Sequence, residues 1–186
     1  MAQAHQMNMR NKLLTALAPD AFDLLRPHLE AVKLELREPL NVANEPTPFI
    51  YFLDEGLGSV MLGPDRTTGV EIGMVGREGL IGTSVVLGAE QSPHHAFIQL
   101  AGAGWRIPSE RLTDAMERSA PLRRLLLRFV HVFGVQMAST AHANADYTVE
   151  ERLARWLLMC HDRCDGDHIA ITHEFMALML GVRRPG

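Results

Sequence analysis

The chain has 186 residues, of which 47% are hydrophobic, and a formal net charge of −4 at pH 7. This length can bury one or two cores, and the charge excludes a protein that binds nucleic acid through a basic surface spread over the whole chain. No apolar run reaches the roughly 18 residues of a membrane span, and residues 1–10 hold no signal-peptide core, so a cytoplasmic protein without a membrane partner is expected.

Short elements fill the first part of the chain. Residues 12–17 and 19–34 are predicted as helices, because Phe22, Leu25, Leu29 and Val32 recur at helical spacing in the second. From about residue 35 to 107, Gly and Pro separate short apolar runs, which is typical of an antiparallel roll or barrel. Residues 70–75 alternate as a half-buried strand should. The predicted strands are 49–53, 58–62, 70–75, 97–100 and 104–107.

A short helix over residues 109–118 and a long one over 121–145 follow the roll. The long helix would measure about 35 Å, more than a small roll can cover. We therefore predict that its apolar stripe forms a two-fold dimer interface, with a core helix of the single chain as the alternative. The residues assigned to this interface are Leu122, Leu126, Phe129, Phe133 and Met137.

The C-terminal part predicts two further helices and a turn. Thr148 and Glu151 match a capping box that begins one helix, which residues 164–167 end. Residues 172–180 form the next amphipathic helix, and Gly181 supplies a tight turn before Arg183 and Arg184. Two helices joined by such a turn are typical of a helix-turn-helix. An ordinary helix ended by Gly and followed by loose basic residues is the alternative.

This order of elements resembles the CRP/FNR superfamily of bacterial transcription regulators. The most specific stretches are residues 76–82 in the roll and 172–184 at the end. The resemblance implies an α+β fold: an antiparallel β-roll, similar to the jelly roll of cyclic-nucleotide-binding domains, with flanking helices and a long dimerisation helix. Residues 1–146 would form this sensor domain. Residues 147–186 would begin an all-α, winged helix-turn-helix domain that is incomplete here, as in a fragment or truncated product.

The resemblance also implies a function without enzymatic activity. A homodimer senses a signal through its roll and places two helix-turn-helix domains on a two-fold operator, so its partners are DNA, a second copy and RNA polymerase. The signal would act around residues 76–96, shift the roll against the long helix near residues 129–139, and turn the DNA-binding domains about residues 146–148. The effector, the operator and the direction of regulation do not follow from the sequence.

The ligand cassette implied by the resemblance contains Gly76, Gly79, Leu80, Ile81, Gly82, Thr83, His94, His95 and Ala96. In members that bind cyclic nucleotides, a Glu accepts the ribose hydroxyl and an Arg donates to the cyclic phosphate. Thr83 stands in place of that Glu, and His94 in place of that Arg. Because both charged anchors are replaced, cyclic AMP is not expected as the effector, and no cofactor is assigned.

The resemblance assigns DNA binding to Thr172, Arg183 and Arg184. Arg184 matches the position where the family often places an Arg that contacts guanine, through the O6 and N7 atoms. Arg183 would reach a phosphate, and Thr172 caps the first helix of the motif. A solvated charged tail is the alternative for both arginines.

Metal chemistry finds little support in the spacing of possible ligands. No Cys precedes Cys160, which excludes the N-terminal iron–sulfur cluster of the oxygen-sensing branch, and nothing selects a haem ligand among nine His. Cys160 and Cys164, with the nearby His161 and His168, lack a standard zinc spacing. No metal site and no catalytic residue are therefore assigned.

Two alternatives of other classes remain. One is a dimeric ligand-binding or interaction module that does not bind DNA. The other is a cupin-type metal enzyme, which the His94-His95 pair suggests. Adjacent residues of a regular strand point to opposite faces, so these two His could not share one metal ion.

Overall fold

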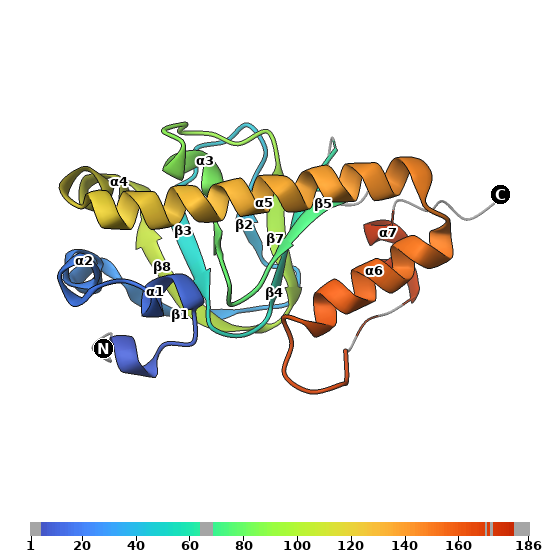
Figure 1. Ribbon diagram of the computed structural model, residues 1–186, viewed down its shortest axis with the longest axis horizontal. Coiled ribbons are helices and arrows are strands. Elements are labelled where there is room, and N and C mark those ends of the chain that lie inside the picture. The colour runs from blue at the N-terminus through green and yellow to red at the C-terminus, as the bar shows by residue number, and fades with distance from the viewer. Residues whose placement is uncertain (1–4, 64–68, 170, 172, 181–186) are drawn as a thin grey trace.

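The computed structural model describes residues 5–63, 69–169, 171 and 173–180. Two four-stranded antiparallel sheets form a β-roll, and a long helix, α5 (Ala120–Asp146), runs across it (Figure 1). Helix α5 extends beyond the roll, and helix α6 (Val149–His161) turns back beside it. The predicted α+β class, with a roll followed by a long helix, is confirmed.

One sheet has the strand order β1-β8-β3-β6 and the other β2-β7-β4-β5. Five predicted strands correspond to β3, β4, β5, β7 and β8, whereas β1, β2 and β6 were not predicted. Strands β2 and β6 have three and two residues, too few to show an alternating pattern. The bounds are β1 (Glu30–Leu34), β2 (Pro39–Asn41), β3 (Phe49–Leu53), β4 (Leu57–Leu62), β5 (Val70–Val75), β6 (Leu80–Ile81), β7 (His95–Leu100) and β8 (Gly102–Pro108).

The helix predicted over residues 19–34 is wrong in its second half. Helix α2 (Pro19–Leu25) leads into a 3₁₀ turn, η2 (Arg26–His28), and then into β1. Pro27 lies in that turn and cannot donate the backbone hydrogen bond that would continue the α-helix. Strand β1 instead pairs with β8, which places Val32 opposite Gly104.

The helices that follow the roll lie close to their predicted positions. Thr148 and Glu151 form the predicted capping box: the Thr148 Oγ1 accepts from the Glu151 N–H at 3.3 Å, and the Glu151 Oε2 accepts from the Thr148 N–H at 2.9 Å. Both donors at the start of α6 are thereby satisfied. The other helices are the 3₁₀ helix η1 (Gln6–Asn8), α1 (Lys12–Thr15), α3 (Thr83–Val86), α4 (Ser109–Arg118) and α7 (His173–Met179).

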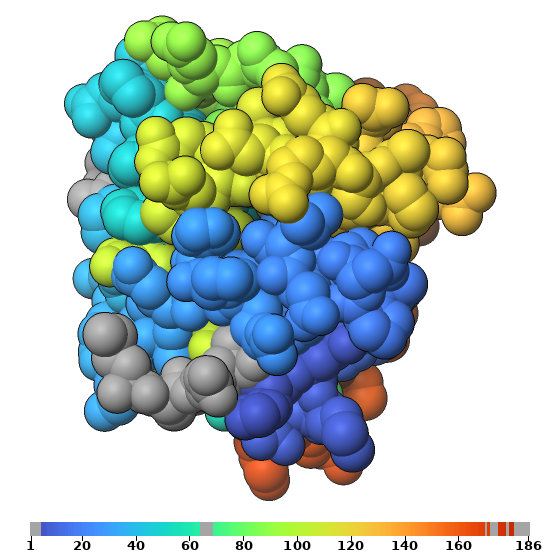
Figure 2. Space-filling model, turned by 90° about the vertical axis from the view of Figure 1, so that its left-hand side faces the viewer, coloured from blue at the N-terminus to red at the C-terminus, as the bar shows by residue number. Residues whose placement is uncertain are grey.

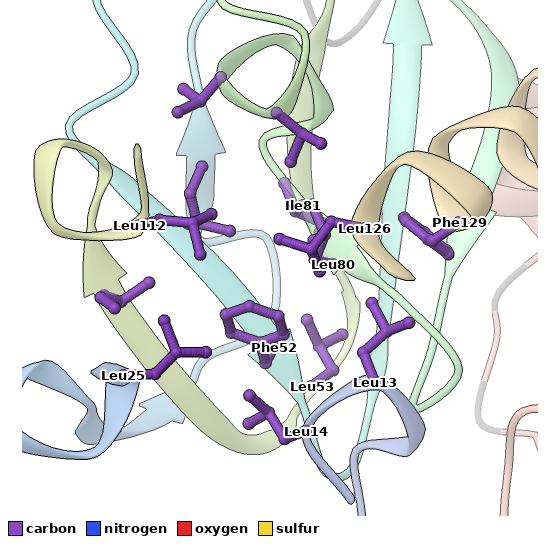
Figure 3. Close-up of a cluster of buried hydrophobic side chains, with 14 of the residues drawn as sticks. Leu13, Leu14, Leu25, Phe52, Leu53, Leu80, Ile81, Leu112, Leu126 and Phe129 are labelled. Atoms are coloured by element: carbon purple, nitrogen blue, oxygen red, sulfur yellow. The ribbon is translucent and has the colours of Figure 1, made fainter. Parts of the chain in front are cut away.

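The main core lies between the two sheets and the helices that cover them. Figure 3 shows side chains from the N-terminal helices, β3, β6, α4 and α5 converging, with Phe52 near the centre. The N-terminal helices close one end of the roll beside α4 and the start of α5 (Figure 2). Leu14 and Leu25 are fully buried there.

The apolar stripe of α5 belongs to this core. Leu122, Leu126, Phe129 and Phe133 are buried within the chain itself, and Met137 packs against the same cluster. The first four side chains are covered by their own roll and are therefore not free to contact a second copy, whereas Met137 is half-buried and its place in a dimer interface stays a prediction. The length argument failed because the roll, α3 and α4 together offer an apolar surface to this face of α5.

A second apolar cluster lies on the outer face of the sheet β2-β7-β4-β5. Leu57, Met61, Met74 and Phe97 of the sheet contact side chains of α6 and α7 there. Strand β5 is consequently covered on both faces, unlike the half-exposed strand that its alternation predicts. Among the described residues, no helix combines the length and apolarity that crossing a membrane requires.

The orientation of α5 can be tested with two adjacent leucines. Leu126 is 1% exposed and Leu127 is 40% exposed. Leu126→Ala should lower the free energy of unfolding by about 2–5 kcal/mol, because it leaves a cavity in the core. Leu127→Ala should change it by less than about 1 kcal/mol. Urea denaturation measures both variants, and equal losses would contradict the orientation described above.

Candidate ligand cassette and DNA-facing segment

The cassette is built around the turn between β6 and α3. Gly82 lies at this turn with a φ of +107°, a conformation that L side chains rarely adopt. A Cβ atom at Gly82 would also lie 2.3 Å from the Ile50 Cδ1. The backbone conformation therefore favours glycine at this position, and α3 begins directly after it.

Five of the predicted cassette residues meet around one small cavity. They share its wall with residues of β2, β4, α3 and the segment before β7. The space between them is about 20 Å³, enough for roughly one water molecule. The side chains of Val60 and Ile81 are buried at this wall. The predicted residues are Ile81, Gly82, Thr83, His94 and Ala96, and the additional ones are Asn41, Val60, Ser84 and Ser92.

The wall of this cavity combines polar and apolar groups and carries little charge. His94 is the one titratable residue among those that line it, and burial lowers the pKa of its imidazole, which favours the neutral form. Asn41 donates from Nδ2 to the His94 carbonyl at 2.8 Å and accepts from the Thr47 hydroxyl at 2.8 Å. The buried Ser84 hydroxyl has no hydrogen-bond partner. The wall thus offers no fixed cation to a cyclic phosphate.

The other predicted cassette residues lie away from the cavity. Gly79 packs against α5, where a Cβ atom would lie 2.2 Å from the Phe129 Cε2. Leu80 is buried in the main core, and Gly76 lies beside the Arg163 side chain. The His95 Nδ1 accepts from the Ala43 N–H at 3.2 Å. These residues therefore join the cassette to neighbouring elements rather than face a ligand.

Sequence reasoning missed the polar residues that complete the wall. Asn41, Ser84 and Ser92 come from separate segments, and each is a single polar residue in an unremarkable local pattern. Only the folding of β2 against β7, and of α3 over the roll, brings them together. Because these residues come from separate segments, no fixed interval between them in the sequence could have identified the wall.

The residues predicted to bind DNA, Thr172, Arg183 and Arg184, lie outside the described residues. The helix predicted to precede the turn is present as α7, and its end packs on the roll through Met179 and Leu180. Arg152 of α6 donates from Nη1 to the Leu180 carbonyl at 3.1 Å. Helices α6 and α7 are therefore joined to each other as well as to the sheet.

The two thiols are free. Cys160 is completely buried, and its Sγ accepts from the Gln99 Nε2 at 3.6 Å. Burial, followed by the negative charge of Glu71, raises the pKa of the Cys160 thiol to about 12. Within the described part of the chain, no three His, Cys, Asp or Glu side chains gather in a group that could hold a metal ion.

The fold matches solved structures of bacterial regulators, although no protein-family profile and no curated protein match the sequence. A Eubacterium rectale protein assigned to the CRP/FNR family of transcriptional regulators matches with a TM-score of 0.75 at 16% identity, over 92% of this chain and 81% of that one. The c-di-GMP-responsive global regulator CLP from Xanthomonas campestris matches with a TM-score of 0.66 at 15% identity, over 89% and 86%.

FixK2 from Bradyrhizobium japonicum matches with a TM-score of 0.69 at 13% identity, over 83% of this chain and 78% of that one. A shorter match, over 63% of this chain with a TM-score of 0.51, is to a cAMP-binding acyltransferase from Mycobacterium smegmatis. The chain therefore shares the fold of CRP/FNR-family regulators over most of its length, at low sequence identity.

The cavity predicts a negative result with cyclic nucleotides. Isothermal titration with cyclic AMP, cyclic GMP and cyclic di-GMP should show no saturable heat for cyclic AMP or cyclic GMP up to about 1 mM, because room and a cationic partner for the phosphate are both lacking. Cyclic di-GMP, tested alongside, would have to bind outside this cavity. Saturable binding of cyclic AMP at micromolar concentration would contradict the description of the wall.

Proposed function

We propose that the chain is a DNA-binding transcription regulator of the CRP/FNR type, acting as a homodimer on a two-fold operator. The observation that carries this proposal is the shared fold, which extends past the roll and α5 into the C-terminal helices and covers 92% of the chain in one match. In the sequence, Gly181, Arg183 and Arg184 match the turn and the start of the DNA-reading helix that the family resemblance implies. The boundary between sensor and DNA-binding domains would lie between residues 146 and 147.

The same proposal makes the protein a regulator rather than an enzyme. The cassette wall combines polar and apolar groups and is uncharged apart from His94, which suits recognition of a small neutral group or a purely structural role. His94 and His95 have different surroundings, which does not favour a cupin-type metal site. As a regulator, the protein would work in the cytoplasm with DNA and RNA polymerase as partners.

The dimer interface is proposed on the outward face of α5. Val132 is 62% exposed and Val135 54% exposed, and Ser139 and His142 continue the same face. The spacing of these residues, three, four and three, is that of a two-helix seam. The neighbouring Ala138 is small and exposed, which allows close approach of a second α5.

Contacts between the roll and α5 offer a route for the signal. Gly79 of the cassette lies against the Phe129 ring, so a shift of the cassette displaces this side chain. The Gln136 side chain accepts from the Met74 N–H at 2.8 Å and donates to the Met74 carbonyl at 3.2 Å. Movement of the roll would therefore reach α5 and, through residues 146–148, the DNA-binding domain.

The proposed interface can be tested by introducing a like charge. Val135→Glu should weaken self-association at least about tenfold, because two carboxylates would meet across the two-fold axis. Val42→Glu, at a 38%-exposed site on the roll, is the matched control and should leave the dimer intact. Sedimentation velocity measures both variants, and a Val135→Glu protein that remains dimeric would refute this interface.

The DNA-reading role can be tested with the two terminal arginines. On a DNA sequence selected from a random pool by the unsubstituted protein, Arg184→Ala should reduce base preference by about 1–3 kcal/mol. Arg183→Ala should weaken binding equally on all sequences and lower the salt slope by about 1. Fluorescence anisotropy on matched and mismatched duplexes distinguishes the two, and the absence of any selected sequence would favour the interaction-module alternative.

A further inference from the structure

The outer face of the sheet β2-β7-β4-β5 contains a buried polar cluster within its apolar surface. Ser59 of β4, Glu71 of β5 and Gln99 of β7 are 0%, 5% and 2% exposed. The apolar side chains around them include Leu57, Met61, Met74 and Phe97. Burial of a carboxyl group in such surroundings costs free energy unless the group is neutral or well paired. The protonation state of Glu71 therefore depends on its hydrogen-bond partners and on the charges around it.

The polar cluster reaches across to the helices that cover the sheet. The Trp156 Nε1 of α6 donates to the Glu71 Oε1 at 2.7 Å. The Gln99 Nε2 donates to the Sγ of Cys160 at 3.6 Å, and the Ser59 Oγ lies 3.7 Å from the Sδ of Met179. Every member of the cluster therefore contacts α6 or α7, and departure of these helices would expose Glu71 to water.

With the Gln99 amide oriented so that its Nε2 faces Cys160, the hydrogen bonds around Ser59 are balanced when Glu71 carries a proton. The Ser59 Oγ lies 2.6 Å from the Glu71 Oε2 and 2.5 Å from the Gln99 Oε1. One hydroxyl proton cannot serve two acceptors. With a protonated Glu71, the carboxyl donates to Ser59 and Ser59 donates to Gln99, whose amide is oriented by its bond to Cys160. Ionisation leaves two acceptors competing for one proton.

The charged groups around Glu71 do not replace that proton. Arg155 and Arg163 exert favourable charge on the carboxylate. However, the Arg155 Nη1 donates to the Thr140 hydroxyl at 3.3 Å, and the Arg163 Nε donates to Glu78 at 2.6 Å. Burial raises the pKa of Glu71 to about 7, against the opposing effects of the Ser59 and Trp156 hydrogen bonds and these arginines.

Two further ionisable side chains face the cluster from α6. Arg152 lines the small cavity beside Glu71, and its Nη1 is bonded to the Leu180 carbonyl. The Cys160 thiol stays protonated at neutral pH, because its pKa is raised to about 12. From α5, the same cavity is lined by Thr140, Ala143 and Asn144, which do not titrate. Among the described side chains that line this cavity, Glu71 is therefore the group that changes charge near neutral pH.

We propose that Ser59, Glu71 and Gln99, together with Trp156, form a proton-sensitive latch that holds α6 and α7 on the roll and releases them as pH rises. The consequence of release rests on the proposed function. Release would free α6 and α7, which precede the proposed DNA-reading segment, to adopt another orientation. The latch itself is a property of the contact between sheet and helices. It goes beyond the signal route through the cassette, because it acts on the opposite face of the sheet.

The direction of the pH effect follows from proton binding in the two states. In the docked state the pKa of Glu71 is about 7, and on release the pKa of this carboxyl group returns towards its ordinary value of 4.5. Between these values the docked form binds more protons than the released form. The docking equilibrium should therefore fall by up to about tenfold per pH unit as pH rises through this window, and level off above about pH 7.

Cys160 provides a direct measure of docking, because its thiol is completely buried under the latch. In a Cys164→Ser background, the rate of Cys160 labelling by a disulfide reagent is compared with the rate in the denatured chain at the same pH, which cancels the change in thiolate fraction. Protection should fall at least about tenfold between pH 5.5 and 7.5. Protection that does not change over this range would overturn the proposal.

A neutral isostere and a matched exposed site identify the titrating group. Glu71→Gln should remove the pH dependence, whereas Glu117→Gln, at an exposed carboxyl on α4, should retain it. Equal slopes in Glu71→Gln and the parent protein would overturn the assignment to Glu71. Circular dichroism checks that each variant is folded.

Trp156→Phe gives a second, independent readout. Without the indole N–H, ionised Glu71 loses a donor, so the fall in protection should extend to higher pH than in the parent. An unchanged window would contradict the latch even if Glu71→Gln failed to fold. These labelling experiments contain no DNA, so a negative result would refute the latch and leave the proposed function untouched. A protein with the expected pH dependence of labelling that does not bind DNA would instead refute the proposed function and leave the latch untouched.

Discussion

The sheet β2-β7-β4-β5 has to be buried on both of its faces, and the rest of the structure follows from this constraint. Its inner face packs on the sheet β1-β8-β3-β6 and completes the main core. Its outer face is equally apolar, and α6 and α7 cover it. Hydrophobic burial thereby brings the C-terminal helices back onto the roll.

The same constraint explains the tension at Glu71. Burial of an apolar face favours complete exclusion of water, while an acidic group within it favours hydration. The contact with α6 excludes water and still accommodates the carboxyl group, because Ser59 and Trp156 form hydrogen bonds with it. In the proposed latch, burial of apolar side chains stabilises docking of α6 and α7, and the protonation state of Glu71 adjusts it. Such a contact suits a two-state element with a small free-energy difference between its states.

Helix α5 serves two surfaces at once. One face carries Leu126 and Phe133 into the core of its own chain, and the opposite face presents Val132 and Val135 to solvent. In the proposed dimer, this helix would contact the roll on one side and a second copy on the other. The Gln136 side chain, bonded to the Met74 backbone, fixes the axial position of α5 relative to the sheet.

Local pattern determined a large part of this protein: five strands, α4, the long α5 and the capping box of α6 follow from alternation, spacing and hydrogen-bond chemistry within a few residues. The replacement of two charged anchors by Thr83 and His94 could likewise be read directly. The spacing of apolar residues predicts that one face of a helix or strand is apolar, but it does not predict which segment packs on that face. Only the tertiary structure decided that the stripe of α5 packs on its own roll, and that Glu71 is buried beneath α6, because both depend on which surfaces segments far apart in the chain present to each other.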